Sequence, residues 1–201
     1  MMCQGRLVAP LFVLISILIT ACGQTPSNSR WQSFPVTIYA DSSAINTADK
    51  QSDLNDAMNF WEEKAGKKLF NFKGQYSGPQ PYSGSITDPG TVLDNVIFFQ
   101  NPWPLTPNII GQTLVSASGG SIQNAMVMIN GEANFCTGDC TGQPDSNSQR
   151  KNFTHELGHF LGLQHVQDVT NVMYPVIQPG GSLTNVTIDT ATFNALVTGN
   201  Q

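Results

Sequence analysis

The segment from His155 to His165 reads His-Glu-Leu-Gly-His-Phe-Leu-Gly-Leu-Gln-His, and it restricts the local fold more than any other part of the chain. On a helix, His155 and His159 lie four residues apart and share one face. Gly162 tolerates the left-handed conformation that ends helices. A helix that stops there would let the chain turn and bring His165 back toward the other two histidines.

This arrangement suits a metal ion. Zinc accepts nitrogen ligands in a tetrahedral array, and three protein ligands leave the fourth position for water, as in catalytic zinc sites. Glu156 follows the first histidine and could reach such a water without ligating the metal. The chain has three histidines, and all lie in this motif. We therefore expect one zinc ion held by His155, His159 and His165, against the competing interpretation of core or surface histidines at helical spacing.

The extended pattern resembles the motif of the metzincin zinc peptidases, His-Glu-x-x-His-x-x-Gly-x-x-His followed by a Met-containing turn. Asn171-Val172-Met173-Tyr174-Pro175 supplies that turn, and its short spacing and Met-Tyr-Pro ending are similar to those of matrixins. Asp168 also matches the matrixin pattern, whereas Val166 stands where matrixins usually have a small hydroxyl residue. The close resemblance covers residues 154–175.

The resemblance implies an α+β catalytic domain, in which a twisted mixed β-sheet carries a backing helix, an active-site helix and a C-terminal helix. It also implies zinc-dependent hydrolysis of peptide bonds, with Glu156 as general base and acid and Met173 as a hydrophobic floor beneath the metal. A substrate would lie extended along an edge strand, for which Thr113–Ala117 is the candidate, by strand addition. The supporting residues expected are Gly162, Asp168, Tyr174 and Pro175.

The N-terminus predicts export. Residues 1–21 combine a positive charge, an apolar run and a small last residue, as signal peptides do. A signal anchor is the competing interpretation, but the run is shorter than a membrane-spanning helix needs. Ile19-Thr20-Ala21-Cys22 resembles the bacterial lipobox, which implies lipidation of Cys22 and durable membrane anchoring. We expect an exported, lipid-anchored protein of the bacterial envelope, at the outer membrane or cell surface.

The remaining cysteines and the composition fit one exported domain. Cys136 and Cys140 favour a disulfide, and a metal-binding thiolate pair is the lesser interpretation. Residues 22–33 are expected to form a flexible tether. Residues 34–201 should form a single, monomeric catalytic domain with an N-terminal sheet lobe and a small C-terminal lobe after about residue 162. The net charge of −5 and the absence of a basic stripe argue against nucleic acid as a partner.

Two other functions stay open. A lipid-anchored zinc-binding protein that captures a partner or peptide without cleaving it would use the same ligands, although such a site needs no base like Glu156 and is usually closed by a fourth ligand. A different zinc hydrolase, such as an amidase acting on cell-wall peptides, would share the chemistry. Calcium bound by Asp and backbone carbonyls also stays open, since animal matrixins carry extra zinc and calcium sites.

Hydrophobic periodicity, caps and turn residues predict the elements of the domain. The expected strands are 34–40, 69–72, 95–99, 113–117 and 125–129, and the expected helices are 47–65, about 149–161 and 187–197.

Overall fold

The computed structural model of the chain describes residues 29–82, 94–138, 140, 142–143, 146–177, 183 and 186–198. The predicted signal peptide and Cys22 therefore lie outside the described residues. In chain order, the elements are β1 Val36–Ala40, α1 Ser42–Ile45, α2 Ala48–Ala65, β2 Phe70–Gln75, β3 Val96–Gln100, β4 Gly111–Ser118, β5 Ser121–Asn130, β6 Phe135–Cys136, β7 Asn147–Ser148, α3 Gln149–Leu161 and α4 Thr190–Thr198.

A mixed five-stranded sheet forms one layer of the molecule, in the order β2-β1-β3-β5-β4. The first four strands run parallel, and β4 pairs antiparallel with β5 at one edge. Gly119 and Gly120 join β4 and β5, both with positive φ (58° and 77°), as a two-residue hairpin turn requires. The α+β prediction is confirmed, and the strand predicted at 113–117 is the edge strand of this sheet.

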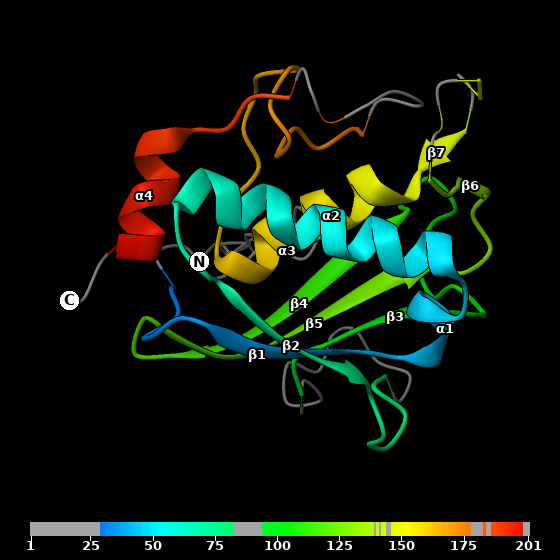
Figure 1. Cartoon of the computed structure of the whole chain (residues 1–201), viewed down its shortest axis with the longest axis horizontal. Coiled ribbons are helices and arrows are strands. Elements are labelled where there is room, and N and C mark those ends of the chain that lie inside the picture. Colours follow the sequence, from blue (N-terminus) through cyan, green and yellow to red (C-terminus); the bar gives the residue numbers. More distant parts are fainter. Residues whose placement is uncertain are drawn as a thin grey trace, which may run out of the picture.

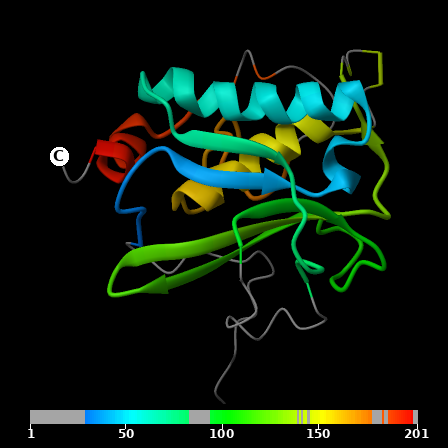
Figure 2. The same cartoon turned by 60° about the horizontal axis from the view of Figure 1, so that its bottom comes forward.

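Two long helices, α2 and α3, lie side by side on one face of the sheet, and α4 lies near one end of them (Figures 1 and 2). Helix α2 begins after Thr47, whose side chain accepts a hydrogen bond from Lys50 N, and ends at Gly66 with φ 64°. Threonine and glycine are typical residues for these two cap positions. One face of α2 is apolar and buried, with Leu54, Ala57, Met58 and Trp61.

Helix α3 lies at the centre of the molecule, and eleven of its thirteen residues are buried. Its aromatic side chains join the main core, where Phe153 and Phe160 have no exposed surface. Helix α3 is thus enclosed by α2, the sheet and the loops that follow it. No helix among the described residues has the length and apolar character needed to cross a membrane.

The N-terminal residues differ from the tether expected at 22–33. Ser29 and Trp31 are buried, and Trp31 Nε1 donates a hydrogen bond to Phe160 O (2.7 Å). Arg30 forms a bridge with Ser121 at the start of β5. A flexible tether would therefore end before Ser29. The predicted division into two lobes at about residue 162 stays a prediction.

Candidate metal centre

The local fold of α3 and its C-terminal cap place the three histidines. Gly162 caps α3 in the left-handed region (φ 107°), and the next amide, Leu163 N, donates back to Gly158 O (2.9 Å). This reversal is the turn that the sequence predicts. It brings His165, from the following loop, to His155 and His159 on the helix.

The Nε2 atoms of the three histidines converge. His165 Nε2 lies 3.2 Å from His155 Nε2 and 3.0 Å from His159 Nε2. The other ring nitrogens face backbone carbonyls, His155 Nδ1 to Val172 O (2.7 Å) and His159 Nδ1 to Leu163 O (2.8 Å). A nitrogen that faces a carbonyl must donate, so the Nε2 atoms of these two neutral rings carry lone pairs toward one point.

This donor set fits a zinc ion. Converging lone pairs repel one another unless a cation lies between them, and carbonyl acceptors on the outer nitrogen are the usual means of orienting histidine ligands. Tetrahedral zinc with ligand bonds of about 2.0–2.1 Å separates its nitrogen ligands by about 3.3 Å, close to the distances found. Burial lowers the pKa of His155 to about 4 and that of His159 well below its usual value, which keeps both rings neutral and able to ligate.

Glu156 lies beside the triad, and its carboxylate is directed to the edge strand. Its side chain is 2% exposed, and Thr113 of β4 has Oγ1 2.6 Å from Glu156 Oε2. Burial raises the pKa of Glu156 to about 7, and the Thr113 hydrogen bond opposes that shift.

The Met-turn packs against α3 at Gly158. Met173 is 2% exposed, and its sulfur lies so close to Gly158 that a side chain on Gly158 would collide with it. Asn171 Oδ1 accepts a hydrogen bond from Met173 N (2.9 Å), and Val166 N donates to Met173 O (3.1 Å). Val166 joins the Met-turn through its backbone, so this contact does not need the small hydroxyl residue that matrixins usually have there.

The other supporting residues lie in the same loop at different depths. Asp168 Oδ1 accepts from Thr170 N (2.9 Å) and Thr170 Oγ1 (2.8 Å), and these hydrogen bonds lower the pKa of Asp168. Asp168 thus shapes the loop before the Met-turn, while Asn171 holds the turn itself. Tyr174 is half-buried and Pro175 is exposed.

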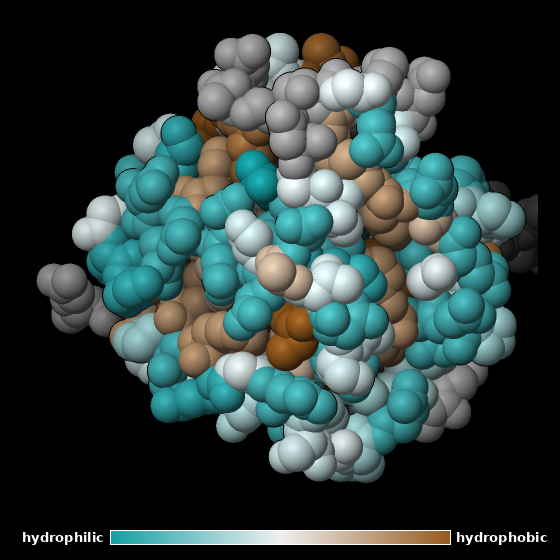
Figure 3. All heavy atoms as spheres, turned by 45° about the vertical axis from the view of Figure 1, so that its right-hand side comes forward, coloured by the Kyte–Doolittle hydropathy of each residue, from teal (hydrophilic) through white to brown (hydrophobic). Residues whose placement is uncertain are grey.

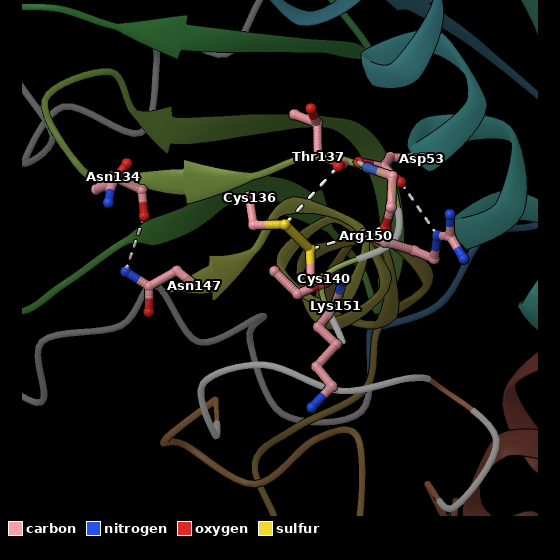
Figure 4. Close-up of a disulfide and its surroundings, with 10 residues drawn as sticks. Asp53, Asn134, Cys136, Thr137, Cys140, Asn147, Arg150 and Lys151 are labelled. Atoms are coloured by element: carbon pink, nitrogen blue, oxygen red, sulfur yellow. Dashed lines mark hydrogen bonds and ion pairs between the residues drawn. A yellow bond between two sulfur atoms is a disulfide. The ribbon is translucent and has the colours of Figure 1, made fainter. Parts of the chain in front are cut away.

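Cys136 and Cys140 are joined by a disulfide just before α3 (Figure 4). The loop is tied to both long helices through Asp53 of α2, whose buried carboxylate accepts from Gly138 N (3.0 Å) and from Arg150 Nε of α3 (3.1 Å). The disulfide lies in the segment that leads into α3, the helix that carries His155 and His159.

Sequence reasoning missed the roles of four residues of the site. Thr113 and Gly111 hold the carboxylate of Glu156, Asn171 braces the Met-turn, and Gly158 makes room for Met173. Gly158 was visible inside the motif, and its position one turn before Gly162 could have suggested a close contact. Thr113 and Gly111 lie more than forty residues from Glu156 in the chain and carry no local signal.

Comparison with known proteins agrees with this geometry. Residues 110–195 match the matrixin family of peptidases (M10), a range that includes the edge strand, the disulfide loop, α3, the Met-turn and much of α4. No curated protein sequence matches the chain significantly. The matrixin match over residues 110–195 and the converging His155, His159 and His165 show that this part of the chain is matrixin-like, and together they support a zinc metallopeptidase.

Proposed function

We propose that the protein is an endopeptidase that hydrolyses peptide bonds of extracellular or envelope proteins. The observation that carries the proposal is Glu156, a buried carboxyl group on the residue that directly follows the first of the three converging histidines. A site that only stores zinc or fixes a loop gains nothing from a buried carboxyl group next to a ligand, whereas hydrolysis needs a group that moves a proton.

The residues divide the chemistry between them. His155, His159 and His165 would hold zinc, which supplies a Lewis acid that polarises the peptide carbonyl and activates water. Glu156 accepts a proton from the attacking water and donates it to the leaving amine. Its burial excludes bulk water from the proton transfer, and Thr113 holds it in place.

Strand β4 is the candidate platform for the substrate. It ends the sheet, so one of its sides has no neighbour within the five-stranded order. An extended peptide could pair there, next to Glu156. Val169 and Val176 are the large hydrophobic residues that are exposed among the described residues, and both flank the Met-turn. They offer apolar contact for substrate side chains beyond the cut bond.

We further propose a monomer that carries one zinc ion and is anchored in the bacterial envelope by lipid on Cys22. On the face that comes forward in Figure 3, hydrophilic side chains separate the hydrophobic areas from one another. Mass spectrometry of the N-terminal peptide and membrane fractionation of Cys22→Ala test the anchor. A wild-type protein without acyl groups, or an equally membrane-bound variant, would refute it. Calcium has no support beyond the family resemblance.

Cleavage of casein or gelatin tests the endopeptidase proposal directly. Wild type loaded with zinc should cleave, a chelator should abolish cleavage, and zinc should restore it. Glu156→Gln should bind zinc with equal stoichiometry and lose at least about a hundredfold in rate, the usual contribution of a general base. Zinc-loaded wild type that is as inert as Glu156→Gln would instead favour the zinc-binding protein without peptidase activity.

A further inference from the structure

The hydroxyl of Thr113 lies between two oxygen atoms of Glu156. Thr113 Oγ1 is 2.6 Å from the carboxylate Oε2 and 3.1 Å from the backbone O of the same residue. The hydroxyl has one hydrogen to donate, and the shorter distance is typical of donation to a carboxylate. Thr113 has no exposed surface, so water does not compete for this contact.

Gly111 restricts the carboxylate from the same strand. A Cβ atom on Gly111 would lie 2.5 Å from Glu156 Oε1 and 2.9 Å from Cδ, so the backbone of β4 touches the carboxyl group directly. Residues two apart on a strand face the same side. Gly111 thus supplies a surface without a side chain, and Thr113 supplies a donor. Together they leave the Glu156 side chain little freedom to rotate.

We propose that Thr113 is a positioning residue of the peptidase reaction. Its hydroxyl engages Oε2 of Glu156 and thereby fixes the orientation of the carboxylate that accepts the proton of the attacking water. The inference rests on the proposed endopeptidase function and extends it to a residue on the edge strand. Because β4 is also the candidate platform for the substrate, one strand would align both the peptide and the group that protonates its leaving amine.

The matched variants are Thr113→Val, Thr113→Ser and Thr154→Val. Valine keeps the shape of threonine and removes the hydroxyl, and serine keeps the hydroxyl. Thr154 is also fully buried, but its hydroxyl donates to the backbone O of Arg150 (2.8 Å) and not to Glu156. Thr154→Val is therefore the control for removing a buried hydroxyl. Each variant is assayed for kcat, KM, bound zinc and thermal unfolding.

Thr113→Val should lower kcat about tenfold or more and leave KM and zinc stoichiometry within twofold, since a base that turns freely loses part of the usual 10²–10⁴-fold contribution. Thr113→Ser should restore at least half of kcat, and Thr154→Val should keep it. Full kcat in Thr113→Val, a change confined to KM, or an equal loss in Thr113→Ser and Thr113→Val would overturn the inference.

A second measurement does not depend on activity. In zinc-free protein, Thr113→Val should lower the melting temperature more in the wild-type background than in Glu156→Ala, because only the wild type then buries a carboxyl group that has lost its hydrogen-bond partner. Thr154→Val should cause equal shifts in both backgrounds. Equal shifts for Thr113→Val would overturn the inference. An inert wild type would overturn the endopeptidase proposal and the inference together, whereas an active wild type with an active Thr113→Val would overturn the inference alone.

Discussion

At the scale of single residues, the site combines ionisable groups whose pKa values burial shifts in opposite directions. Burial lowers the pKa of His155 to about 4 and raises that of Glu156 to about 7. Between about pH 4 and 6.5, an unfolded chain binds more protons at the histidine than the folded chain does, so this group makes stability rise with pH. Between about pH 4.5 and 7, the folded chain binds more protons at Glu156, which makes stability fall with pH.

The first prediction concerns zinc-free protein, in which these two effects oppose each other. Glu156→Gln removes the carboxyl effect and leaves that of the histidines. Between pH 6.5 and 4.5 the variant should lose stability more steeply than wild type, by up to about 1.4 kcal/mol per pH unit, the value for one proton. Urea unfolding in the presence of chelator measures the free energy of unfolding at each pH. Parallel pH profiles for wild type and Glu156→Gln would contradict the claim that the two groups have opposite effects on stability.

Gly158 carries the second prediction. A side chain there would collide with Met173 and would lie within 2.9 Å of Trp61 Cζ2. Gly158→Ala should therefore destabilise the protein by about 1–3 kcal/mol despite the better helix propensity of alanine, the usual cost of overpacking a core. Gly142→Ala is the control, since a Cβ atom there meets nothing within 4 Å. Equal urea midpoints for the two variants would contradict the close packing.

The residues that could be predicted from sequence are those whose chemistry is local. The three histidines and Glu156 follow from spacing on one helix and one turn. Thr113 could not be found, because its role depends on the strand that happens to cross Glu156. Asn171 was missed for a different reason. Asp168 is close by and matches the family pattern, but the amide of Asn171 is the group that reaches Met173 N.

At the scale of elements, α2 and α3 were predicted nearly to their ends, because each has an apolar pattern and a local cap. The strand order was not predictable from the residues, since strands that are adjacent in the sheet, such as β1 and β3, are far apart in sequence. The short α1 and the pair β6–β7 were also missed. β6–β7 lies in the polar segment that contains the disulfide, where two residues per strand give no periodic signal.

The link between α2, α3 and the disulfide loop gives the third prediction. Arg150→Met removes the partner of the fully buried Asp53, and burial already raises the pKa of that carboxyl group. We expect the free energy of unfolding to fall by about 2–3 kcal/mol. This is less than the usual cost of breaking a buried ion pair, because 30% of the Arg150 side-chain surface is exposed.

The double variant Asp53→Asn with Arg150→Met tests the cause of that loss. It removes the unpaired charge, so it should recover a large part of the stability that Arg150→Met loses. Denaturant unfolding of wild type, the two single variants and the double variant gives the coupling free energy between Asp53 and Arg150. A double variant that is as unstable as the sum of the single changes would show that the ion pair does not link these elements.

At the scale of the whole molecule, the N-terminal segment closes the fold around α3. Arg30 N donates to Gly120 O (3.1 Å) at the hairpin turn, and Ile122 N donates to Arg30 O (2.8 Å). The ring centroids of Trp31 and Phe160 are 5.2 Å apart. Ser29 O would be 2.8 Å from a Cβ atom on Gly162. The segment therefore lies against the turn that brings His165 to the metal centre.

This arrangement predicts that Trp31 supports zinc binding from outside the site. Trp31→Ala removes a buried indole and its hydrogen bond to Phe160 O, and should destabilise the protein by about 3–5 kcal/mol. Because Phe160 follows His159, a looser end of α3 should also weaken the convergence of the histidines. We expect Trp31→Ala to bind zinc at least about tenfold more weakly, measured by competition with a chelator at a temperature where the variant is folded.

Trp103→Ala is the matched control for that measurement. Trp103 is buried to a similar extent, 8% exposed against 7% for Trp31, but it belongs to the separate cluster of Tyr76, Val96 and Met128. It should lose stability and retain its affinity for zinc. Equal weakening of zinc binding in both variants would mean that affinity follows global stability, and that the N-terminal segment holds the fold without shaping the metal centre. A selective loss in Trp31→Ala would instead place the determinants of the zinc site partly in a segment more than 120 residues away from it in the chain.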